Sequence, residues 1–179
     1  MARYVVLLRG VNVGKGNRVP MAEFRALLEE LGCTGVVTLL NSGNAVFTSK
    51  SRSATALAKS IAAAISRAFD VTTPVIVKSA AQFAAIVHGN PIVPPDADHS
   101  KFLVTFAMDT KQLAALATLE KQRHPDERLA ITAHAAYLHC AGGILESDMA
   151  KALLDRTGRS VTTRNWGTTL KIHALLGEG

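Results

Sequence analysis

The chain has 179 residues, of which 48% are hydrophobic and 19% are charged, a composition that supports a packed core and excludes an intrinsically disordered protein. No run of 18 apolar residues occurs, and the apolar stretch from Tyr4 to Leu8 is too short for a signal peptide, so neither a membrane-spanning segment nor secretion is predicted. The formal charge of +6 attracts phosphates, nucleic acids or anionic metabolites without selecting among them.

The first half of the chain has the hydrophobic pattern of a βαββαβ unit, the ferredoxin-like order. Strands are expected at residues 3–9, 36–40, 45–49 and 74–78. A first helix begins near Pro20 and ends at Gly32, and a second, capped by Ser53, runs to about Phe69. The first strand is apolar at nearly every position, so both faces of its sheet are expected to be covered.

A short helix is expected over 79–88, and Gly89 to Asp96 then concentrate glycine and proline, which predicts a domain boundary. The pattern restarts after this break with a strand at 101–108. A helix from Thr110, strands near 128–133 and 136–140, and a helix from Ser147 to Gly158 follow in that order.

The second half therefore predicts β-α-β-β-α, the first plan without its last strand, and then a final helix from about Thr163 to Leu176, capped by Thr162 or Thr163. The predicted fold is α+β, with two ferredoxin-like lobes and a C-terminal helix. The lobes are assigned to residues 1–88 and 101–179, joined by a Pro/Gly-rich connector at 89–100.

Three segments carry a family resemblance: LRGVNVGKGNRVPMAEFRALLEELG from Leu8, TLLNSGNAVF from Thr38 and TRNWGTTLKI from Thr163. Together they resemble the family of domain-of-unknown-function proteins numbered 1697, over nearly the whole chain. The resemblance implies an α+β fold with ferredoxin-like halves in a soluble, mostly bacterial protein, and it implies no activity. The matching positions are Arg9, Gly10, Asn12, Gly14, Asn17, Met21, Ser42, Gly43, Asn44, Asn165, Trp166 and Lys171. Where the family often has a Gly-Gly pair, this chain has Gly14-Lys15-Gly16, which adds a charge.

One edge of the first lobe gathers groups that suit an anion. In a βαββαβ sheet the spatial strand order is four, one, three, two, so the Gly-rich loop 10–18 and the turn 41–44 should lie side by side, near the start of the first helix. Backbone N–H groups and the helix dipole favour a phosphate or carboxylate there. The candidate ligand-binding residues at this edge are Arg9, Asn12, Gly14, Lys15, Gly16, Asn17, Ser42 and Asn44. The alternative is that glycine and asparagine stand in these loops because they tolerate a positive φ.

The final segment offers two more basic candidates, Arg164 and Lys171, which would complete a basic cleft between the lobes if the last helix packs beside the Gly-rich loop. Trp166 shares a helical face with Leu170 and His173, so we expect it to anchor this helix in the core.

Other chemistries are weakly indicated. The loop at 10–16 lacks both the spacing and the Ser/Thr of a P-loop, and it does not match a dinucleotide-binding fingerprint. RNA-recognition domains share the strand plan and stack bases on exposed strand aromatics, for which Tyr4 and Phe47 are the candidates. A sheet that is covered on both faces could not bind RNA in that way.

The sequence indicates no metal site and no cofactor. His134 and His139 are five residues apart and lack a third ligand. Cys33 and Cys140 cannot form a disulfide framework and are expected to be small buried or near-surface residues in a cytoplasmic protein. Asp126 and Glu127, and Glu146 with Asp148, are expected to be solvated turn and helix-start charges.

The preferred hypothesis is therefore a binding module for a small anionic or nucleotide-like ligand, held at the Gly-loop edge or in the interlobe cleft. A nucleic-acid-binding protein, an enzyme of unidentified reaction and a protein-partner role are the alternatives. The sequence leaves the ligand, the oligomeric state and any catalytic residue open, and no membrane association is expected.

Overall fold

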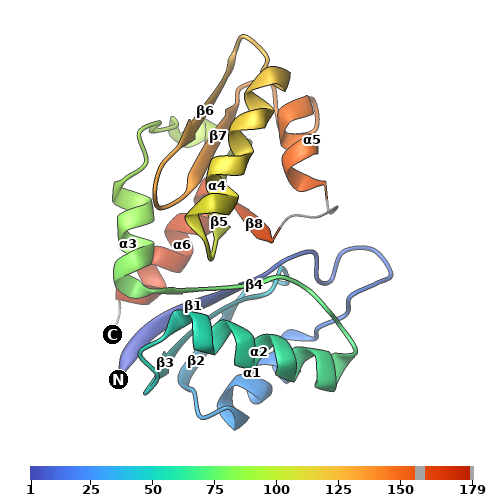
Figure 1. The fold of residues 1–179 in the computed structure, drawn as a ribbon, viewed down its shortest axis with the longest axis vertical. Coiled ribbons are helices and arrows are strands. Elements are labelled where there is room, and N and C mark those ends of the chain that lie inside the picture. The colour runs from blue at the N-terminus through green and yellow to red at the C-terminus, as the bar shows by residue number, and fades with distance from the viewer. Residues whose placement is uncertain (156–159, 178–179) are drawn as a thin grey trace. The chain divides into compact units, whose positions relative to one another are not determined.

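The computed structural model describes residues 1–155 and 160–177 (Figure 1). The chain packs into two compact units. The first consists of Met1–Phe83 and the end of the chain from Ile172 onward, and the second is Ala84–Lys171. The division thus falls within two helices, α3 (Ala80–His88) and α6 (Trp166–Gly177). The assignment of 89–100 as a connector between domains stays a prediction.

The first unit contains a four-stranded antiparallel sheet in the order β2-β3-β1-β4. Its strands are β1 (Ala2–Leu8), β2 (Thr34–Leu39), β3 (Asn44–Ser49) and β4 (Val75–Ser79). Helices α1 (Met21–Glu30) and α2 (Ala54–Phe69) pack against each other and against the sheet. This is the predicted strand order, read from the opposite edge.

The cap of α2 and the burial of β1 follow from the local sequence as predicted. The Ser53 hydroxyl accepts a hydrogen bond from the Ala56 amide at 3.1 Å, which caps α2. Val5 and Val6 point to opposite faces of the sheet, and both are fully buried. The expectation that both faces of the first strand are covered is therefore confirmed.

The second unit contains a second antiparallel sheet with the corresponding order, β6-β7-β5-β8. Its strands are β5 (Phe102–Ala107), β6 (Glu127–Ile131), β7 (Ala136–Cys140) and β8 (Val161–Asn165). The predicted α+β class with two related lobes is confirmed, but the second lobe was expected to lack its last strand, and β8 supplies it. The β-branched run Val161–Thr163 favours a strand, so the final helix begins at Trp166 rather than near Thr163.

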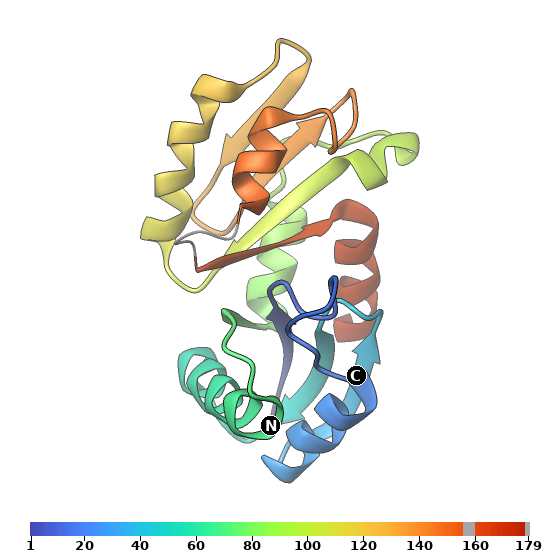
Figure 2. The same ribbon diagram turned by 90° about the vertical axis from the view of Figure 1, so that its right-hand side faces the viewer.

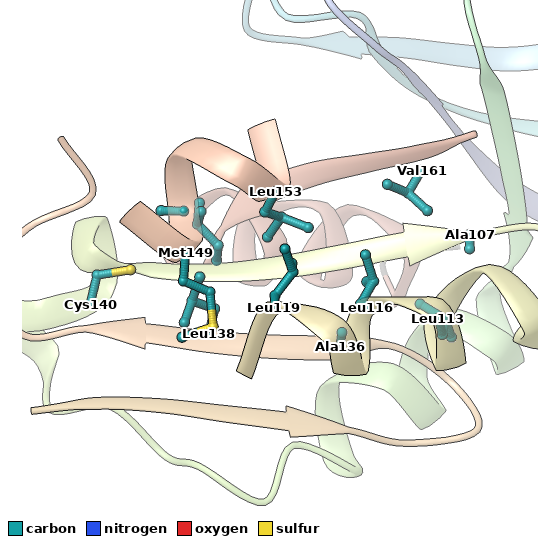
Figure 3. Packing of buried hydrophobic residues seen from close by; sticks show 12 residues of the cluster. Ala107, Leu113, Leu116, Leu119, Ala136, Leu138, Cys140, Met149, Leu153 and Val161 are labelled. Atoms are coloured by element: carbon teal, nitrogen blue, oxygen red, sulfur yellow. The ribbon is translucent and has the colours of Figure 1, made fainter. Parts of the chain in front are cut away.

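Helix α4 (Thr110–Ala114) continues as the 3₁₀ segment η2 (Ala115–Gln122), and α5 (Asp148–Leu154) follows β7. A further 3₁₀ segment, η1 (Asp96–Lys101), precedes β5. Figure 3 shows the leucines of α4 and η2 packed with Met149 and Leu153 of α5 in one cluster of buried residues. The Ser147 hydroxyl caps α5 by accepting from the Ala150 amide at 2.9 Å, as predicted, whereas the expected stop at Gly158 lies outside the described residues.

Candidate functional site

The Gly-rich loop 10–18 and the turn 41–44 meet at one edge of the first sheet, as the strand order predicted. The Asn12 side-chain amide donates to the Asn41 carbonyl and to the Val19 carbonyl, each at 2.8 Å. Its oxygen accepts from the Val19 amide at 2.9 Å. Figure 2 shows the loop after β1 beside the turn between β2 and β3. One side chain thus joins the loop, the turn and the approach to α1.

Two further asparagines hold this region in shape. Asn17 has a φ of 50° and Asn12 a φ of 57°. The backbone amide of Asn12 donates to the backbone carbonyl of Asn17 at 3.0 Å, which closes the loop. The buried Asn44 side chain donates to the Leu39 carbonyl at 2.9 Å and to the Ser42 hydroxyl at 3.0 Å. The amides that the sequence assigned to a ligand therefore bind the protein's own backbone, so the shape of the edge is set before any ligand arrives.

Gly43 lies where the turn contacts the end of β1. Its carbonyl accepts from the Leu8 amide at 2.9 Å. A β-carbon at Gly43 would lie 2.6 Å from the Leu8 β-carbon and 2.9 Å from a Val11 methyl, and its φ is 81°. Glycine is therefore required here for packing and for conformation.

The charges of the loop and of the turn are all basic, whereas an acidic residue, Glu23, lies in the first turn of the adjoining helix α1. Arg9, Lys15 and Arg18 are basic, and neither 9–18 nor 40–44 contains an acidic residue. Lys15 and Arg18 are exposed, and in the described chain neither side chain forms an ion pair. The net positive charge of the loop attracts an anion to this surface.

Helix α1 starts next to these charges without a side-chain cap. Pro20 occupies the N-cap position and has no side-chain acceptor, and the first intrahelical bond runs from the Phe24 amide to the Pro20 carbonyl at 2.9 Å. The amides of residues 21–23 precede that bond, so the helix offers them no carbonyl partner. They carry the positive end of the helix dipole, which favours an anion.

Gly14 and Gly16 are exposed on the loop, and a β-carbon on either would meet nothing within 4 Å. Gly14 has a φ of 66°, which explains why glycine occupies this position. Gly16 has neither a positive φ nor a close neighbour, so the fold itself does not require glycine there. An open backbone at this position allows a ligand to approach closely.

Comparison with known proteins places the chain in a family. The family model described as "Protein of unknown function (DUF1697)" matches residues 1–137. The chain belongs to this family. The structure of the conserved bacterial protein SP0830 from Streptococcus pneumoniae is similar to this DUF1697 protein, with 29% sequence identity, a TM-score of 0.74 and 98% of each chain covered. A search of curated protein sequences found no match.

The two other predicted ligand residues of this DUF1697 protein belong to the second unit. The Arg164 guanidinium donates to the Thr162 hydroxyl at 2.8 Å and to the Thr163 carbonyl at 2.7 Å, so it is bound within β8. Burial lowers the pKa of Arg164 to about 10. Lys171 is exposed on α6. Their participation in the Gly-loop site stays a prediction.

The aromatic residues of the RNA alternative are inaccessible. Tyr4 is 3% exposed and Phe47 is fully buried, and their rings stack on each other with centroids 6.0 Å apart. A base could stack on them only if the sheet were uncovered.

No group of three or more His, Cys, Asp or Glu residues within residues 1–155 and 160–177 is arranged to hold a metal ion. His139 is hydrogen-bonded through Nε2 to the Asp98 carboxylate at 2.9 Å. Burial raises the pKa of both thiols, Cys33 and Cys140, which disfavours a reactive thiolate. No described helix has the length and apolar character needed to cross a membrane.

The expectation of solvated charges was wrong for one residue, Glu127. It is only 4% exposed, because it is the first residue of β6 and pairs with Cys140 of β7. Its neighbour Asp126 is exposed, as predicted. The sequence predicted that this strand begins near residue 128. Glu127 was therefore assigned to the preceding turn, and its burial was not predicted.

Proposed function

We propose that this DUF1697 protein is a binding module for a small anion, a phosphate or carboxylate group of a nucleotide-like metabolite. The ligand site is the Gly-loop edge, which comprises loop 10–18, turn 41–44 and the start of α1. The observation that carries the proposal is the uncapped start of α1 beside a preorganised loop whose charges are all basic.

Each part of the edge has a role in this proposal. Lys15 and Arg18 attract the anion and pair with it, because neither side chain is engaged in an ion pair within the described residues. The amides of residues 21–23 donate hydrogen bonds to its oxygens. Asn12 and Asn44 position the loop and the turn rather than the ligand. Preorganisation of this kind lowers the entropic cost of binding.

The test measures thermal unfolding of the full chain with inorganic phosphate, nucleoside mono- and diphosphates, sugar phosphates and small carboxylates. A ligand that binds only the native state stabilises it by about 2.7 kcal/mol at 100 times its dissociation constant. We expect at least one anion to raise the midpoint of thermal unfolding. Lys15→Ala and Arg18→Ala should each lower the affinity for that anion by about tenfold, since charge-assisted hydrogen bonds contribute roughly 1.5–3 kcal/mol.

The control is Lys59→Ala, which removes an exposed lysine from α2, away from the loop. It changes the net charge by the same amount and should leave the affinity unchanged. An equal loss in all three variants would indicate non-specific attraction. Stabilisation by oligonucleotides alone, decreasing steeply with salt, would favour the nucleic-acid alternative instead.

A further inference from the structure

Glu127 is a buried residue of the second unit, and only part of the hydrogen-bonding capacity of its carboxylate is satisfied. Oε2 accepts from the His124 backbone amide at 3.0 Å, and the Glu127 amide donates to the His124 carbonyl at 3.0 Å. These two bonds close a tight turn before β6. In the part of the chain that the structure describes, no donor bonds to the other oxygen, Oε1. An ionised carboxylate offers about four acceptor positions, so most of its capacity is left over.

Among the described residues, no cationic side chain pairs with the Glu127 carboxylate. Arg128, the next residue of β6, has its side chain on the opposite face of the sheet. The guanidinium of Arg123, four residues before Glu127, pairs through Nε with Glu120 and donates through Nη1 to the backbone carbonyl of Glu127 at 3.0 Å, not to its carboxylate. Buried charges in proteins are as a rule paired or bind a cation, because an isolated one is costly.

Glu127 lines a cavity of about 140 Å³. Two further acidic residues, Asp126 and Glu146, both exposed, also line it, together with Gly142 and Gly143, which have no side chains. His124 lies at the same wall with its ring 70% exposed. The cavity is therefore acidic in a chain of formal charge +6, the opposite of the Gly-loop edge.

The size and lining of the cavity indicate the kind of cation. One water molecule takes up about 30 Å³ in the liquid, so the space suits a small organic group better than a bare ion. The described residues contain no set of three side chains arranged to coordinate a metal. The leftover acceptor on a planar carboxylate suits N–H donors of an ammonium or guanidinium group.

We propose that the cavity beside Glu127 is a binding site for an organic cation, with an alkylammonium or guanidinium group donating to Oε1 of Glu127. Asp126 and Glu146 add attraction at the rim of the cavity. Gly142 and Gly143 keep its wall open. The site lies in the second unit and does not depend on the anion site proposed above.

The experiment is an NMR titration of the ¹⁵N-labelled full chain with methylammonium chloride and, separately, methylguanidinium chloride. We expect a saturable shift of the Gly142 and Gly143 amide resonances with at least one of the two. Glu127→Gln keeps the acceptor for the His124 amide but removes the charge, and should weaken binding at least about tenfold. Glu30→Gln, an exposed change of equal charge in α1, should leave the affinity unaltered.

Two exposed variants keep the test decisive if Glu127→Gln does not fold. Asp126→Asn and Glu146→Gln are each expected to reduce the affinity a few-fold, as exposed charges do. Absence of a saturable shift with both organic cations overturns the proposal. Shifts of the same amides by magnesium chloride, without any by the organic cations, overturn it in favour of a metal ion.

Discussion

Two glycines of the Gly-loop edge serve different purposes, and substitution by alanine separates them. Gly43→Ala would place a β-carbon 2.6 Å from that of Leu8 at a φ of 81°, and we expect it to lower the free energy of unfolding by about 2–4 kcal/mol through overpacking and strain. Gly16→Ala meets no neighbour within 4 Å and should change stability by less than about 1 kcal/mol. Urea unfolding measures both.

The same pair of variants tests the ligand site. Gly16→Ala is expected to lower the affinity for the anion that stabilises the protein in the thermal unfolding experiment, although the fold is intact. The reason is that a methyl group then occupies the space through which the ligand approaches the backbone. If Gly16→Ala instead bound that anion as well as the wild type, the backbone at Gly16 would not contact the ligand. A stable Gly43→Ala variant would contradict the close approach of the turn to β1.

The asparagines show the limit of residue-level prediction. The sequence correctly placed Asn12 and Asn44 at one edge of the sheet, because loop position and strand order determine that. It could not show where their amides point, since an asparagine that stabilises its own loop and one that binds a ligand stand in the same Gly-rich context. The hydrogen bonds from Asn12 to Val19 and Asn41 became evident only from the structure.

At the scale of elements, strands and caps with strong local signals were predictable. Ser53 and Ser147 cap their helices as expected. Strand β8 was not predicted, because the helical spacing of Trp166 and Leu170 was taken to begin earlier in the chain, within the Thr-rich segment that precedes Trp166. The partner of β8 is β5, more than 50 residues earlier in the chain, and such non-local pairing leaves no periodic trace in a short segment.

Asn165 rather than Thr162 or Thr163 caps α6. Its side-chain oxygen accepts from the Thr168 amide at 2.8 Å. We expect Asn165→Ala to lower the free energy of unfolding by about 1 kcal/mol, a common value for the loss of a cap. Asn165→Asp retains the acceptor and adds a favourable charge at the helix start, so it should be nearly neutral. Chemical denaturation of both variants makes the comparison, and equal losses would contradict the capping role.

At the scale of the molecule, the two units repeat one plan although their sequences differ. Orders β2-β3-β1-β4 and β6-β7-β5-β8 correspond strand for strand, and each unit has apolar residues buried around its own sheet. Hydrophobic periodicity and turn residues encode this plan, which is why the sequence predicted all of it except β8. The burial of Glu127 depends instead on register, where a shift of one residue exchanges a buried side chain for an exposed one.

The stability of the whole protein toward acid should depend on Asp98, which joins η1 to the second sheet. The hydrogen bond from His139 is the main cause that lowers the pKa of Asp98 below its usual 3.8, and the nearby charge of Lys101 acts in the same direction. The folded protein therefore holds this proton less tightly than the unfolded chain does. The resulting stabilisation is present above the unfolded pKa and is lost as the pH falls through the lower folded pKa.

Asp98→Asn should consequently lower the free energy of unfolding at neutral pH and flatten its decline between about pH 5 and pH 2. Urea unfolding at a series of pH values measures that profile. Asp70→Asn, which removes an exposed carboxylate at the end of α2, is the matched change of charge. If both variants flattened the profile equally, general charge repulsion at low pH would explain the effect, and the Asp98–His139 pair would have no particular part in it.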